Sequence, residues 1–167
     1  MTVVIADTSP LNYLALIGEI TILYRLYRRV VIPPEVLAEL NDRSAPPEVQ
    51  QWIHSPPEWL EIRVVHIGQE DQALQQIDAG ERAAILLAQE NPGALLLIDE
   101  AAGRAEANRR GIRNTGTLGI LRAAATRNFV DLPTALTRLA ATNFRISQSL
   151  VDDLLAEHAA RKLRKNM

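Results

Sequence analysis

Ala-Leu-Leu-Leu-Ile-Asp, at residues 94–99, is a run of five apolar residues that ends in an aspartate. A short apolar run without polar alternation is typical of a strand that is buried on both faces of a sheet. The same pattern occurs near the start of the chain, where residues 3–6 are apolar and Asp7 follows them. Residues 30–32 are a third run of this kind. These runs predict the buried strands of a mostly parallel sheet.

Helical patterns separate these runs. Ser9 is the predicted N-cap of a helix in which Pro10 is the first residue, and Gly18 ends it. Further predicted elements are a helix from Pro34, one after residues 78–81, one from Asp99 to Gly111, two amphipathic helices over 132–139 and 146–155, a weaker strand at 60–65 and a very short one at 112–113. Strands that alternate with helices predict an α/β fold, a three-layer sandwich with a mostly parallel central sheet flanked by helices. We expect one domain over residues 1–167.

The composition excludes several classes of protein. The chain has 167 residues, of which 47% are hydrophobic and 23% charged, as in an average globular domain. It contains no cysteine, so disulfides, zinc-thiolate sites and cysteine nucleophiles are excluded. The three histidines lack ligand spacing, and the net charge of −2 does not suit a wholly basic nucleic-acid coat. No apolar run approaches the roughly 20 residues of a membrane span, and we expect a cytoplasmic protein.

Four acidic residues stand where an apolar element ends or where a helix faces the same edge: Asp7, Glu39, Glu81 and Asp99. Each has a structural explanation. Asp7 and Asp99 could cap the helices that follow them, and Glu81 could form a capping box with Asp78. Glu39 could lie on a solvated helix face.

Taken together, the four acids favour a metal site. Parallel strands end at one edge of the sheet, so we expect Asp7 and Asp99 to meet there. Crowded carboxylates raise each other's pKa unless a cation lies among them. Mg²⁺ or Mn²⁺ suits carboxylate and water oxygens, and such ions commonly assist reactions of phosphate esters.

The order of these segments resembles PIN-domain proteins, in particular the compact prokaryotic branch related to VapC-type toxins of toxin-antitoxin systems. The resembling segments are residues 5–11, 32–40, 78–81, 96–100 and 111–121. The resemblance extends over nearly the whole chain. It implies a PIN-like sandwich and a divalent-metal-dependent ribonuclease that hydrolyses RNA phosphodiester bonds.

The resemblance also implies roles for the acids. Asp7 and Asp99 would be direct metal ligands, and Glu39 and Glu81 would complete the metal shell and position the attacking water. Many family members have aspartate at the position of Glu81, although this branch commonly has the Gly-Glu pair.

Further residues are candidates beside these four. Asp78 or Glu100 could substitute for Glu81. Thr8 or Ser9 could bind a phosphate or hold Asp7 in place, and Arg104 could bind phosphate bidentately, although a surface ion pair is its more ordinary role.

The resemblance implies RNA as substrate, an antitoxin protein that covers the acidic edge, and a homodimer. Residues 16–27 are rich in apolar and aromatic side chains, most of which we expect in the core, and Tyr24 and Tyr27 are candidates for the dimer surface. The alternative function is a PIN-like module that binds RNA or protein without catalysis. A haloacid-dehalogenase-like phosphatase is excluded because Ser9 stands where a second aspartate is needed. A phosphoreceiver is excluded because the chain's two lysines both lie in its last residues.

Overall fold

The computed structural model describes residues 2–67 and 71–167, which form a five-stranded sheet of order β3-β2-β1-β4-β5. All of its strand pairings are parallel. The strands are β1 (Val4–Ala6), β2 (Val30–Ile32), β3 (Leu60–Ile62), β4 (Leu95–Leu97) and β5 (Arg113–Thr115). The chain therefore starts at the centre of the sheet, adds β2 and β3 on one side, and then adds β4 and β5 on the other.

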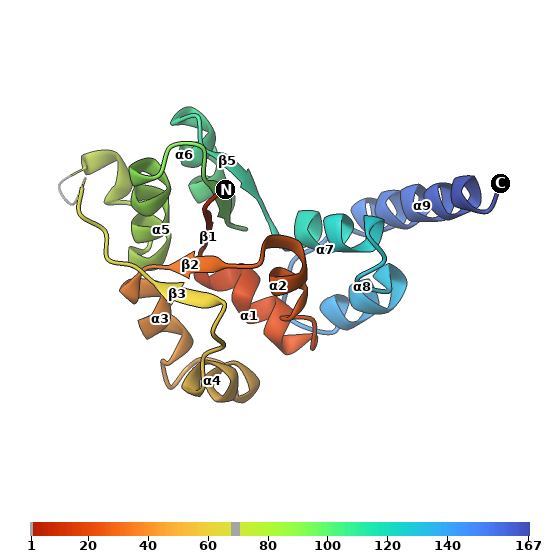
Figure 1. Cartoon of the computed structure of the whole chain (residues 1–167), viewed down its shortest axis with the longest axis horizontal. Helices are drawn as coiled ribbons and strands as arrows, with labels where there is room; N and C mark the ends of the chain where they lie inside the picture. The colour runs from red at the N-terminus through yellow and green to blue at the C-terminus, as the bar shows by residue number, and fades with distance from the viewer. Residues whose placement is uncertain (1, 68–70) are drawn as a thin grey trace.

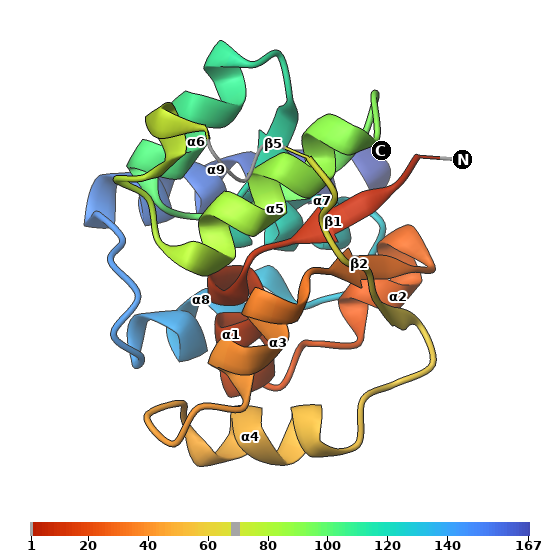
Figure 2. The ribbon, with the colours of Figure 1, turned by 90° about the vertical axis from the view of Figure 1, so that its left-hand side faces the viewer.

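Helices follow almost every strand, as Figure 1 shows. They are α1 (Thr8–Leu16), α2 (Ile22–Tyr27), α3 (Pro34–Leu40), α4 (Pro47–His54), α5 (Ala79–Glu90), α6 (Ala101–Arg109), α7 (Thr117–Thr126), α8 (Leu132–Ala140) and α9 (Gln148–Lys165), with a short 3-10 helix at Gln72–Leu74. Figure 2 shows α5 on one side of the central strand and α1 and α3 on the other. The C-terminal helix α9 extends away from the sheet (Figure 1).

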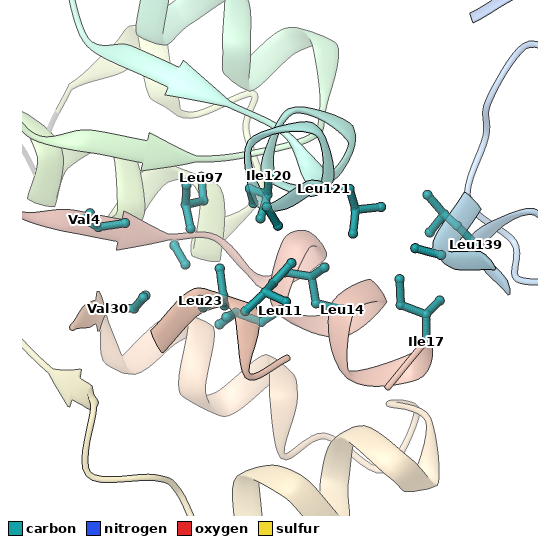
Figure 3. Packing of buried hydrophobic residues seen from close by; sticks show 14 of the residues in the cluster. Val4, Leu11, Leu14, Ile17, Leu23, Val30, Leu97, Ile120, Leu121 and Leu139 are labelled. Atoms are coloured by element: carbon teal, nitrogen blue, oxygen red, sulfur yellow. The ribbon is translucent and has the colours of Figure 1, made fainter. Parts of the chain in front are cut away.

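Successive strand residues point to opposite faces of the sheet and bury two separate hydrophobic clusters. Val4 and Ala6 of β1 belong to a large cluster with α1, α2, α3, α4, α7 and α8. Ile5 belongs to a second cluster, formed mainly with α5. Figure 3 shows the first cluster, in which Leu11 of α1, Leu97 of β4 and Ile120 of α7 come together. The sheet is thus covered on both faces, which confirms the predicted three-layer α/β sandwich.

The start of α1 corrects one prediction. Asp7, and not Ser9, occupies the N-cap position, and α1 begins at Thr8. Asp7 has extended backbone angles because its N–H donates to the carbonyl of Leu97, 2.9 Å away, as a continuation of the β1–β4 pairing. Pro10 is tolerated in the first helical turn because the N–H that it lacks would have no partner inside the helix.

Other boundaries differ by a few residues from the predicted ones. The helix predicted from Asp99 begins at Ala101 with Glu100 as its N-cap. Three helices, α2, α4 and α7, were not predicted at all. Gly18 and Gly111 have positive φ angles of 77° and 71° directly after the ends of α1 and α6, as a glycine that stops a helix should. Among the described residues, no helix is both long and apolar enough to span a bilayer.

We expect Leu11→Ala to destabilise the protein by about 2–5 kcal/mol, because the side chain is fully buried and its removal leaves a cavity. Urea unfolding followed by circular dichroism measures this loss. Leu163→Ala on α9 is the matched control, since Leu163 is 67% exposed, and we expect a change within about 0.5 kcal/mol. Equal losses in the two variants would contradict the described core.

Candidate active site

The ends of β1 and β4 place two acidic residues side by side. Ala6 pairs with Leu97 in the parallel register, so Asp7 and Asp99 follow their strands at nearly the same level. The connections change direction between β1 and β4, because β2 lies on one side of β1 and β4 on the other. In open parallel sheets a ligand crevice forms outside the carboxyl ends of the strands at such a switch point.

The first turn of α1 connects one more acid, Glu39, to this position and also binds Asp99. The hydroxyl of Thr8 donates to Oε2 of Glu39 on α3. The hydroxyl of Ser9 donates to Oδ2 of Asp99, at 2.8 Å. The prediction that Thr8 or Ser9 holds Asp7 in place is wrong: each hydroxyl instead donates to another carboxylate beside Asp7. The start of α1 therefore holds α3 and the end of β4 next to Asp7.

Asp99 is the most firmly held of the four acids. Its Oδ1 accepts the backbone N–H of Thr117 at 2.7 Å, and its Oδ2 accepts the hydroxyl of Thr117 at 2.7 Å in addition to that of Ser9. Asp99 does not cap the helix that follows it; it binds the first N–H of α7, which begins after β5. A carboxylate offers about four acceptor positions, so about one remains for a ligand.

Glu39 is held from a second side by α5. The backbone N–H of Gly80 donates to its Oε1 at 3.1 Å. A Cβ atom at position 80 would lie 2.6 Å from both carboxylate oxygens of Glu39, so a side chain there would push this carboxylate away from the Gly80 N–H. This contact explains why glycine stands at position 80 of the Gly-Glu pair.

Glu81 and Asp7 are buried with far fewer partners. Glu81 is 7% exposed and Asp7 is 3% exposed. Oε2 of Glu81 lies 3.3 Å from the position that a Cβ of Gly103 would occupy, so this carboxylate packs close to α6. Within the described residues no other side chain donates a hydrogen bond to Asp7 or Glu81. Neither residue caps its helix through its side chain.

Burial and mutual repulsion change the protonation of these two acids. The pKa of Asp7 is raised from its ordinary 3.8 to about 8. Burial is the largest cause, the Thr8 backbone N–H opposes it, and the charges of Glu81, Glu39 and Asp99 contribute to the rise. Burial also raises the pKa of Glu81 from 4.5 to about 7, with contributions from Asp78, Glu100 and Glu39. The four acids thus form one electrostatic group.

No positively charged side chain among the described residues neutralises the four acids. Across residues 2–67 and 71–167 none of the four acids forms an ion pair. No three acidic or histidine side chains in that part of the chain stand as a complete metal-ligand set either. This arrangement still suits Mg²⁺, which is commonly held by one or two carboxylates and several waters. Asp7 offers such an ion a buried carboxylate to which no described side chain donates a hydrogen bond.

The other candidate residues, Asp78, Glu100 and Arg104, lie at the surface around the four acids. Asp78 and Glu100 are exposed, at the N-cap positions of α5 and α6, and both raise the pKa of Glu81. Arg104 is exposed and donates to Asn114 at 3.2 Å. Its Nη1 lies 3.5 Å from the position of a Cβ on Gly116, on the side of Asp99.

Two residues of the site were not singled out from the sequence. Thr117 supplies two of the three hydrogen bonds to Asp99. Gly116 lies so close to Asp99 that a Cβ would be 2.6 Å from Oδ1. The available signal was the sequence Thr-Gly-Thr at residues 115–117, which follows a predicted short strand and so reaches the same sheet edge.

The fold and these acids define an α/β protein with an acidic cluster at a topological switch point of its parallel sheet. The DUF3368 family model, described as a PIN domain, matches residues 3–160. The chain therefore belongs to the PIN-domain family, whose members are generally nucleases that act on RNA and typically use divalent metal ions. A search of curated proteins returned no match, and neither did a search of solved structures. The resemblance to PIN domains is confirmed; the relation to VapC-type toxins stays a prediction.

We expect Gly116→Ala to destabilise the protein by about 1–3 kcal/mol, because the added methyl group overlaps the carboxylate of Asp99. The backbone angles of Gly116, φ −103° and ψ −172°, suit alanine, so the loss should come from that contact. A double-mutant cycle measures it: in the Asp99→Ala background, Gly116→Ala should be neutral or slightly stabilising. An equal loss in both backgrounds would place the strain elsewhere.

The metal-free protein should lose stability as the pH rises from about 4 to about 8. Folded Asp7 holds a proton in this range that the unfolded chain has released, so the unfolding free energy falls with pH. Asp7→Asn should weaken this fall and raise the melting temperature near pH 8. Thermal melting in EDTA at several pH values tests both expectations. Asp153→Asn on the exposed face of α9 is the control, and matching pH slopes in wild type and Asp7→Asn would refute the argument.

Proposed function

We propose that this protein is a divalent-metal-dependent ribonuclease that hydrolyses RNA phosphodiester bonds at Asp7, Glu39, Glu81 and Asp99. The observation that supports this most strongly is the burial of Asp7 among three other carboxylates without an ion pair in the described residues. Such an arrangement destabilises the metal-free fold and is favourable when a cation binds. Membership of the PIN-domain family supports the same conclusion.

Mg²⁺ or Mn²⁺ is the proposed cofactor. Asp7 and Asp99 would bind it directly, and Glu39 and Glu81 would act directly or through water. The ion would polarise the phosphoryl oxygen and make a bound water a better nucleophile. A hard ion of this kind fits because all four candidate ligands are carboxylates and the chain has no cysteine.

The side chains of the chain itself have different tasks in this scheme. Thr8, Ser9 and Thr117 keep Glu39 and Asp99 in fixed orientations through their hydroxyls. No described side chain donates a hydrogen bond to Glu81, so its carboxylate is available to orient the attacking water and to accept its proton. Fixed carboxylates reduce the reorganisation that the reaction requires.

The finer biological role follows the sequence resemblance. We propose a toxin of the VapC type, an antitoxin that covers the acidic edge and presents an arginine to the carboxylates, and a homodimer. Tyr24, which is 43% exposed on α2, is a candidate for the dimer surface, whereas Tyr27 packs mainly against the core.

Cleavage of a mixed RNA pool tests the proposed activity. We expect the purified protein to cut RNA with Mg²⁺ or Mn²⁺ and not with EDTA, and we expect Asp7→Asn to lose at least about 100-fold in rate, because the central ligand is gone. Asp153→Asn should cut at the wild-type rate. Calorimetric titration should show that Asp99→Asn binds Mn²⁺ more weakly than wild type does.

Two outcomes would overturn the proposal. Cutting that persists in Asp7→Asn would show that the activity does not come from this site. The absence of both cutting and divalent-ion binding in wild type would favour the alternative, a PIN-like module that binds RNA or protein without catalysis.

A further inference from the structure

A cleft of about 370 Å³ opens directly beside Asp99. Its volume lies at the lower end of the roughly 300–1,000 Å³ that is typical of small-ligand sites. Three parts of the chain form its walls: the first half of α1, the residues after β4, and the loop between α8 and α9. Its polar, charged and aromatic lining consists of Ser9, Tyr13, Asp99, Glu100, Asn143, Phe144 and Arg145, so Arg145 faces two carboxylates at the edge of the cleft.

One wall of the cleft is aromatic and is fixed by a hydrogen bond. The rings of Tyr13 and Phe144 meet edge to face, with centroids 4.9 Å apart and planes at 81°. The hydroxyl of Tyr13 donates to Oδ1 of Asn143 at 2.7 Å. This bond occupies the acceptor of the amide and leaves its two N–H donors available. The wall therefore combines aromatic surface with a directed pair of donors.

Arg145 gives the cleft its positive charge. Within residues 2–67 and 71–167 its side chain forms no ion pair and no hydrogen bond with another residue, whereas Arg110 and Arg122, for example, are each paired with an acid. The neighbouring edge is strongly acidic, and a phosphate backbone would be repelled there without a cation. An unpaired guanidinium at this position suits a phosphate, which it can bind through two parallel N–H donors.

We infer that this cleft is a nucleotide subsite that holds one unpaired nucleotide of an RNA strand next to the bond that is cut. The base lies against Tyr13 and Phe144, the amide N–H donors of Asn143 bind acceptor atoms on the edge of the base, and Arg145 binds the adjoining phosphate. This inference rests on the proposed ribonuclease function, and it assigns to this cleft the binding of one unpaired base and its adjoining phosphate. Unpaired bases are the ones that aromatic side chains can stack on and whose edges are free to be read.

The inference separates a residue that reads the base from one that positions the strand. A base contact changes the preference among sequences, whereas a phosphate contact weakens all sequences alike. Each phosphate contact to a single strand contributes about 0.7 to the slope of log K against log salt concentration. Asn143 and Arg145 should therefore differ in two independent observables.

Fluorescence anisotropy with labelled oligo(A), oligo(C) and oligo(U) tests this difference. The titrations are run in EDTA and in Ca²⁺ over a series of salt concentrations, and RNA integrity is checked on gels. Arg145→Ala should weaken binding of the three RNAs by a similar factor, on the order of tenfold, and lower the salt slope by about 0.7. Asn143→Ala should change the order of preference among the three RNAs and leave the salt slope unchanged.

Arg43→Ala is the matched control, because Arg43 is exposed in the loop after α3, does not line the cleft and loses the same charge. Asn143 and Arg145 are themselves exposed, so both variants should fold, and melting curves check this. Equal effects of Arg145→Ala and Arg43→Ala would overturn the subsite. So would an unchanged order of preference in Asn143→Ala, or RNA binding that neither variant alters, as expected if the cleft takes a protein partner.

Binding is measured here without cleavage, so the two proposals can fail separately. If the wild type cuts no RNA but the variants show the expected binding differences, the proposed hydrolysis fails and the nucleotide subsite remains. If the wild type cuts RNA and the variants bind as wild type does, the subsite fails and the proposed hydrolysis remains.

Discussion

The repulsion among Asp7, Glu39, Glu81 and Asp99 is the constraint on which the arrangement of this protein depends. Carboxylates that raise each other's pKa do not gather spontaneously, so the fold must hold them. The β1–β4 register fixes Asp7 beside the end of β4, and hydroxyl and N–H donors fix Asp99 and Glu39. Burial of apolar side chains in the two cores on either side of the sheet offsets the free energy of this repulsion.

The four acids divide into two kinds. Asp99 and Glu39 each accept hydrogen bonds from donors on two sides, which fix their orientation. Asp7 and Glu81 are the more buried pair, and both hold protons more tightly than free carboxyl groups do. A cation that entered this edge would replace those protons. Asp99 and Glu39 therefore set the geometry of the site. Asp7 and Glu81 couple the stability of the fold to the binding of protons or of a cation.

The sequence predicted the sheet well and the hydrogen bonds around the acids poorly. Unbroken apolar runs before Asp7 and Asp99 depend only on local pattern, and the rule that parallel strands share a carboxyl edge places these two acids together. The contacts from Gly80 to Glu39 and from Thr117 to Asp99 join residues far apart in sequence, which no periodicity reveals. The N-cap assigned to Ser9 was wrong because strand pairing of Asp7 with Leu97 decided where α1 begins.

The first two turns of α1 contact two of the four acids and one wall of the cleft beside them. Asp7 precedes the helix, Thr8 and Ser9 bind the carboxylates of Glu39 and Asp99, and Tyr13 forms a wall of the neighbouring cleft. These groups belong to one short rigid body, so they cannot move independently. A small molecule that tilted α1 would shift Asp7 and break the hydroxyl bonds to Glu39 and Asp99 in one step. An inhibitor of this site therefore need not contact any acid; it could act as a wedge under the helix.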